Sequence, residues 1–187
     1  TTVQWERTNV NNYFWDGYFV LDRDITCTSE GGYTSFINAH LGSGTWLKYT
    51  VNGSEVDASN VGFRGMFDGR GHVISGMKIG KTDLRGGFIG ILNGVANGRA
   101  FERGTIQNVS FVNMNHDGNN AGWQDYLYSV STHGVVRNIY IQANFFENNG
   151  IMGHGAYATQ DTVMKNIVIS VDSMNSWCDY YNLFGWL

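Results

Sequence analysis

Residues 106–111 read IQNVSF, and the same order of residue types recurs in residues 74–79 (ISGMKI), 136–141 (VRNIYI) and 164–169 (MKNIVI). Each copy has apolar residues at its first, fourth and sixth positions and Asn or Gly at its third. The copies begin at residues 74, 106, 136 and 164, so they are 32, 30 and 28 positions apart. A motif that returns at a nearly fixed interval predicts an architecture in which each repeat stacks on the next.

The third position of each copy interrupts the alternation that is typical of a β-strand. A regular strand points every second side chain to the same face, whereas here the apolar positions shift by one residue after the Asn or Gly. A bend in the left-handed conformation, which Gly and Asn adopt readily, would let both flanking strands point into one core. The residues predicted to form this bend and to stack as a hydrogen-bonded ladder are Gly76, Asn108, Asn138 and Asn166. The alternative is that they only mark hairpin turns.

A second series of apolar-apolar-Gly segments alternates with the first and keeps the same interval. Its members lie at residues 88–90, 127–129, 151–153 and 183–185, and the copy at 127–129 has Ser in place of Gly. Each repeat therefore contains at least two strands, and the 25 glycines with no proline supply the turns. We predict an all-β fold, a single-stranded right-handed parallel β-helix (a solenoid) with coils of about 30 residues.

The chain is predicted to form one domain over residues 1–187. Residues 1–17 are rich in aromatic side chains and are expected to cap the N-terminal end of the stack, where a terminal strand would otherwise expose its edge. Residues 28–60 are polar and Gly-rich, and we expect a loop-rich insertion there.

Composition and motif spacing argue against several classes of function. The net charge is -4 without a Lys/Arg run, which argues against nucleic acid as a partner. No stretch approaches eighteen consecutive apolar residues, so we predict no membrane span. Four of the five histidines, His72, His116, His133 and His154, lack zinc-site spacing, and residues 115–126 depart from a calcium loop at its sixth and twelfth positions. We therefore predict neither a metal nor a cofactor.

Residues 65–77, which read GMFDGRGHVISGM, resemble the family of GLUG-motif repeat proteins. The resemblance extends over residues 18–187, where segments such as Leu183-Phe184-Gly185 alternate with segments such as 106–109. It implies a parallel β-helix of the kind found in bacterial surface proteins, in non-catalytic regions of secreted peptidases, and in phage fibres and spikes. It implies no fixed activity.

The first functional hypothesis is a non-enzymatic structural or adhesive module of a virion or a cell surface. As part of a phage fibre, spike, capsid decoration or bacterial adhesin, it would associate with other virion or surface-protein subunits as a homo- or hetero-oligomer outside the cytoplasm. Aromatic residues next to Asn and Asp suit carbohydrate or a protein interface. The candidates are Trp123, Tyr126, Trp177, Tyr180 and Tyr181. The alternative is that these rings cover the edges of the coils.

The C-terminal copy at 183–185 has no Asn-bearing strand after it. An uncovered strand edge is a site for pairing with another chain. We therefore predict that Trp186 and Leu187 contact another subunit or a further segment of the same product. The alternative is that residues 177–186 fold over the last coil as a cap.

The second functional hypothesis is a polysaccharide hydrolase or lyase on the same solenoid. Glycoside hydrolysis needs a pair of carboxylates, and Asp68 could be one of them. The candidates for the other are Glu102, Asp117, Asp125 and Glu147. The competing interpretation is that Asp68 caps backbone N–H groups in a tight turn.

Overall fold

The computed structural model describes residues 17–27, 48–51, 54–57, 63–79, 88–89, 91–93, 104–116, 127, 130–143, 146–147, 159–160, 162–172 and 174–175. Every regular element in these residues is a β-strand, and most of the strands pair in parallel, so this part of the chain is all-β as predicted. In the same residues there is no helix long and apolar enough to cross a membrane.

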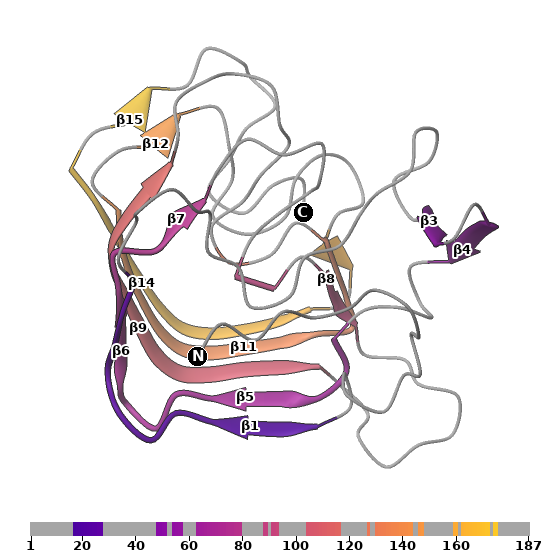
Figure 1. Ribbon diagram of the computed structural model, residues 1–187, viewed down its shortest axis with the longest axis horizontal. Helices are drawn as coiled ribbons and strands as arrows, with labels where there is room; N and C mark the ends of the chain where they lie inside the picture. The colour runs from indigo at the N-terminus through magenta and orange to yellow at the C-terminus, as the bar shows by residue number, and fades with distance from the viewer. Residues whose placement is uncertain are drawn as a thin grey trace.

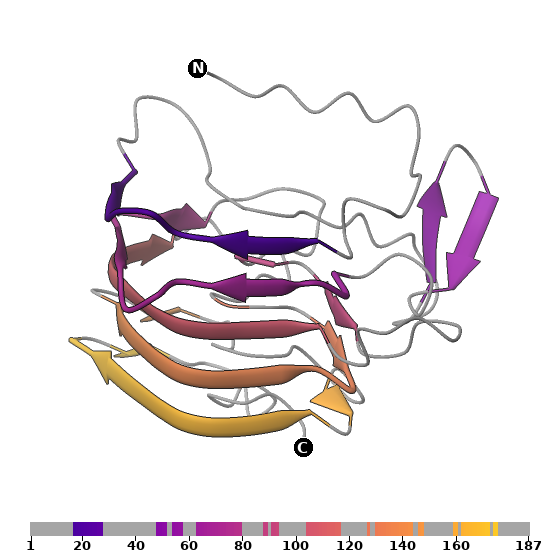
Figure 2. The ribbon, with the colours of Figure 1, turned by 90° about the horizontal axis from the view of Figure 1, so that it is seen from below.

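The main sheet contains eight strands. Five of them lie side by side in chain order (Figure 2): β1 (Tyr18–Val20), β5 (Met66–Asp68), β9 (Thr105–His116), β11 (Val135–Ala143) and β14 (Val163–Val171). The long strands β9, β11 and β14 bend sharply, and the shorter strands follow the same bend as separate elements (Figure 1). These are β2 (Ile25–Thr26), β6 (Val73–Ser75) and β7 (Lys78–Ile79), where β2 pairs with β6, and β6 and β7 pair with β9.

Three smaller sheets complete the described strands. β8 (Ile91–Asn93), β10 (Val130–Thr132) and β13 (Thr159–Gln160) form a parallel sheet, which faces the bent arm of the main sheet in Figure 1. β12 (Phe146–Glu147) and β15 (Met174–Asn175) also pair in parallel, whereas β3 (Lys48–Val51) and β4 (Ser54–Asp57) form an antiparallel hairpin to one side. Each pass of the chain, from one of the five side-by-side strands to the next, thus contributes strands to more than one sheet.

The core lies between the main sheet and the β8–β10–β13 sheet. Inward residues of successive strands are in register, so Phe67, Ile106, Val136 and Met164 form one row. Phe88, which precedes β8, packs its ring edge-on against Phe67 and Phe111 of the main sheet at centroid distances of 4.8 and 4.9 Å. Six of the predicted core residues are buried, namely Ile106, Val109, Phe111, Val136, Ile139 and Ile141. Met164, Ile167 and Ile169 on β14 pack against this cluster but are only partly buried, since β14 has a main-sheet neighbour on one side only among the described strands.

The backbone angles explain the bend, and the register corrects the prediction for Gly76. Asn108, Asn138 and Asn166 have φ angles of 54°, 55° and 54° in the left-handed region, so each strand turns without ending. Gly76 does not belong to this row. Ser75 pairs with Val112, so Gly76 (φ 71°) lies level with Asn113 at a second bend. The motif at 74–79 matches the others in residue type, but Ile74 pairs with Phe111 and not with Ile106, so the motif lies further along β9 than the alignment of the copies predicts.

The predicted N-terminal cap and the predicted loop-rich insertion fall largely outside the described residues. The proposed cap is described only at Gly17, and within residues 28–60 the structure describes only the β3–β4 hairpin.

Candidate functional site

The outer corner of the main sheet carries a ladder of side-chain amides. Asn166 Nδ2 donates to Asn138 Oδ1 at 2.9 Å, and Asn138 Nδ2 donates to Asn108 Oδ1 at 2.8 Å. Asn108 Nδ2 in turn donates to Asp68 Oδ1 at 3.0 Å. The left-handed bend places each amide directly over the next, at the spacing of neighbouring strands. The ladder therefore ends on a carboxylate where the sequence pattern predicted Gly76.

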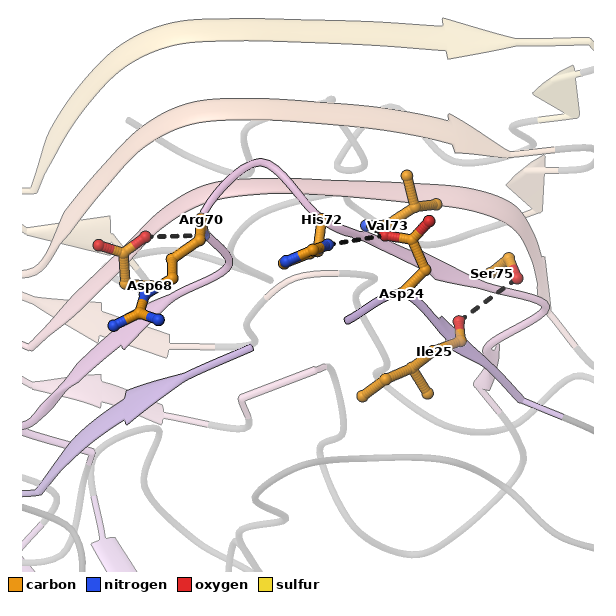
Figure 3. Close-up of polar contacts among 7 residues, drawn as sticks. All are labelled: Asp24, Ile25, Asp68, Arg70, His72, Val73 and Ser75. Atoms are coloured by element: carbon orange, nitrogen blue, oxygen red, sulfur yellow. Dashed lines mark hydrogen bonds and ion pairs between the residues drawn. The ribbon is translucent and has the colours of Figure 1, made fainter. Parts of the chain in front are cut away.

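Asp68 accepts hydrogen bonds at both carboxylate oxygens. Oδ1 accepts from the Arg70 backbone N–H at 2.9 Å (Figure 3) as well as from Asn108, and Oδ2 accepts from Gln107 Nε2 at 2.7 Å and from the Tyr18 hydroxyl at 3.4 Å. Burial alone would raise the pKa of Asp68, but the donors from Arg70, Asn108, Gln107 and Tyr18 together lower it below its ordinary value. At neutral pH this carboxylate is ionised and its acceptor positions are in use.

A second polar row runs beside the ladder on the outward face. The register aligns Asp68, Gln107, Arg137 and Lys165 on successive strands. Gln107 is buried, and it links its neighbours because it donates to Asp68 and accepts from Arg137 Nε at 2.7 Å. The side chains of β5, β9 and β11 are thereby joined across the sheet.

The turn at residues 69–72 replaces the single Asn in the pass that contains β5 and β6. Gly69 N–H donates to the Gln107 carbonyl at 2.9 Å, and Gly71 N–H donates to the Asn108 carbonyl at 2.7 Å, so the turn sits directly on the next strand. A Cβ at Gly69 would lie 2.5 Å from both the Asn108 carbonyl oxygen and Val109 Cβ. Only glycine allows this approach.

Asp24, between β1 and β2, contacts His72 and Val73 in the next pass. Asp24 Oδ1 lies 3.0 Å from His72 Nδ1 and accepts from the Val73 backbone N–H at 2.9 Å (Figure 3). The Val73 N–H, followed by His72, lowers the pKa of Asp24 below its ordinary value. Two residues further along β6, Ser75 Oγ lies 3.2 Å from Thr26 Oγ1 and 3.4 Å from the Ile25 carbonyl oxygen.

These contacts suit a structural role better than a role in acid–base catalysis. A general acid needs a raised pKa and a general base needs open acceptor positions, whereas Asp68 has a lowered pKa and four donors. Of its proposed partners, Glu102, Asp117 and Asp125 lie outside the described residues, and only the backbone of Glu147 is described, in β12. Among the described residues, no group of three or more His, Cys, Asp or Glu side chains could hold a metal ion.

The other predicted site residues are not brought together by the described structure. The aromatic candidates for a glycan or interface site, Trp123, Tyr126, Trp177, Tyr180 and Tyr181, lie outside the described residues, as do Trp186 and Leu187. His116 ends β9, His133 precedes β11, and His154 is outside the described part.

Two features of the corner were not predicted from the sequence. The row of Asp68, Gln107, Arg137 and Lys165 had a usable signal, because the second position of every motif copy is polar. The Asp24–His72 contact had none, since 48 residues separate its partners.

Compared with protein families, curated proteins and solved structures, the chain has no significant match.

Proposed function

We propose that the chain is a non-enzymatic structural or adhesive module of a virion or a cell surface, built as a right-handed parallel β-helix similar to GLUG-motif repeat proteins. The observation that carries this proposal is the continuous ladder from Asp68 through Asn108 and Asn138 to Asn166. Its polar groups bond to one another along the stack, and this arrangement stabilises a scaffold.

The chain order of the strands supports the β-helical part of the proposal. Neighbouring strands of the main sheet are parallel and follow one another in sequence, and the intervening segments contribute β8, β10 and β13 to a second parallel sheet. Crossovers between parallel strands are right-handed in about 98% of cases. We therefore propose coils of about 30 residues, in keeping with the aligned positions Ile106, Val136 and Met164.

The physical properties of such a stack support a role outside the cytoplasm. Each repeat is held by its neighbours on both sides, so a rigid rod can present variable loops to a partner. Phage fibres, spikes, capsid decorations and bacterial adhesins use this combination of rigidity and repetition. The partners we propose are other subunits of the same assembly and carbohydrate on a host surface.

The alternative function is that of a polysaccharide hydrolase or lyase. The purified chain should be incubated with capsular polysaccharides while new reducing ends, unsaturated products and polymer length are followed. We expect no shortening of any polymer. Shortening that is lost in Asp68→Asn or Glu147→Gln, with the circular dichroism spectrum of the folded chain retained, would contradict the non-enzymatic proposal.

A further inference from the structure

Two cations lie in register on neighbouring strands at the outer face of the main sheet. Arg137 on β11 pairs with Lys165 on β14, and both side chains are exposed. Side chains so paired on adjacent strands are about 5 Å apart at their bases. β11 and β14 contain no Asp or Glu, and no carboxylate among the described residues pairs with either cation.

This pairing is unfavourable for the protein alone. Like charges directly opposite one another across two strands are destabilising. By contrast, the exposed cation Arg23 has the Asp22 carboxylate 3.4 Å away. An arrangement that lowers stability without a local compensation is typical of a site that receives its counter-charge from a ligand.

The Arg137 side chain is held in place. Its Nε donates to Gln107 Oε1 at 2.7 Å, and buried Gln107 is anchored in turn by Asp68 at 2.7 Å. The terminal amino groups of Arg137 and the ammonium of Lys165 have no acceptor among the described residues. A guanidinium fixed through Nε keeps its remaining N–H groups in a planar fork that suits an oxyanion.

We propose that Arg137 and Lys165 bind the carboxylate or sulfate groups of an acidic polysaccharide. The inference rests on the proposed function and names the class of carbohydrate that the module binds. The net charge of -4 repels polyanions at long range, so attraction must come from this local pair. Two cations are too few for a nucleic acid, whose binding proteins neutralise several phosphates.

Binding should be measured with polygalacturonate, dextran sulfate and neutral dextran, and with vesicles containing anionic phospholipid. The wild-type chain should bind one or both acidic polymers more tightly than neutral dextran, with an affinity that falls as salt increases. Lys165→Gln should weaken that binding about tenfold. The matched control Arg23→Gln makes the same change in net charge at the bend between β1 and β2, and should change the affinity less than twofold.

Lys165→Glu separates binding from folding. It places an acid opposite Arg137, so the melting temperature should rise by about 1–4 °C while binding of the acidic polymer is lost. A variant that is more stable than wild type but does not bind cannot owe its defect to unfolding.

Four outcomes would overturn the site: equal affinity for neutral dextran and the acidic polymers, equal losses in Lys165→Gln and Arg23→Gln, tighter binding to the anionic vesicles than to either polymer, or no binding at all. None of them affects the proposed scaffold function. Conversely, binding that follows the expected pattern but is accompanied by polymer shortening would support the site and overturn the non-enzymatic function.

Discussion

The main sheet turns the same corner in two different ways. In β9, β11 and β14 a single Asn with a φ near 54° redirects the strand, and the strands run for 12, 9 and 9 residues without interruption. In the pass before them, four residues at 69–72 make the turn, and β5 and β6 are separate strands of 3 residues each. The register shows that these four residues occupy the place of two, Asn108 and Val109.

The difference shows what each solution requires. A single left-handed Asn both bends the chain and supplies a donor and an acceptor to its neighbours, so it can be repeated indefinitely. A longer turn instead has its own backbone N–H groups to satisfy. Asp68 satisfies one of them, from Arg70, and an acceptor-only carboxylate then ends the ladder by accepting from Asn108.

The largest effect is expected in the core behind the Asn corner. Ile139→Asp would place an uncompensated carboxylate where the wild-type side chain is 2% exposed. The cost of several kcal/mol is comparable with the whole stability of a typical domain, about 5–15 kcal/mol. We expect the variant to be unfolded by circular dichroism at 25 °C. Tyr140→Asp, one residue along and facing outward, is the control, and equal damage from the two changes would contradict the alternation described for β11.

The next largest effect tests the four-residue turn. Gly69→Ala forces a Cβ within 2.5 Å of Asn108 and Val109, which should cost about 3 kcal/mol, the upper end for overpacking. Gly71→Ala meets no atom within 4 Å and carries only the strain of its φ of 84°, about 1 kcal/mol. Urea denaturation midpoints should rank wild type, Gly71→Ala and Gly69→Ala in falling order. The reverse ranking of the two variants would mean that conformation rather than packing selects glycine in this turn.

A smaller effect is expected from the ladder itself. Asn138→Ala removes two amide bonds and puts alanine at a φ of 55°, for a loss of about 2 kcal/mol, whereas Asn138→Gly loses the bonds without the strain, about 1 kcal/mol. Asn166→Ala removes one described ladder bond and should be less harmful than Asn138→Ala. Thermal melts of the three variants measure these differences. If Asn138→Gly equals wild type, the ladder bonds contribute nothing beyond allowing the bend.

The repeats that use Asn could be aligned from sequence, whereas the turn at 69–72 could not. Spacings of 30 and 28 residues placed Ile106, Val136 and Met164 in one row because nothing in their corners changes length. Gly76 was misplaced because a local motif carries no information on pairing register: Ile74 pairs with Phe111 and not with Ile106, the residue at the same place in the motif.

The polar corner was less predictable than the core for a related reason. Apolar positions reveal themselves by periodicity, but a contact such as Gln107 to Asp68 depends on which outward residues the register brings together. The turn role of Asp68 was accessible from its neighbours Gly69 and Gly71, and its bond to Arg70 is the predicted cap. Its place at the foot of the ladder required the alignment of β5 with β9.

The smallest effect distinguishes the carboxylate that ends the ladder from the amides that continue it. Because the donors of Asp68 lower its folded-state pKa below the ordinary value of 3.8, its ionised form stabilises the fold at any pH above that value. This contribution should disappear as the pH falls through 3.8 and then through the lower folded-state pKa. Asp68→Asn should therefore cost about 1 kcal/mol at pH 7 and nothing below the folded-state pKa, where wild type is also neutral.

Urea midpoints recorded from pH 7 to pH 2 test this prediction. The control is Asp22→Asn, which removes an exposed carboxylate in the β1–β2 bend. A gap between wild type and Asp68→Asn that stays constant down to pH 2 would mean that amide geometry, rather than charge, makes the difference at this corner.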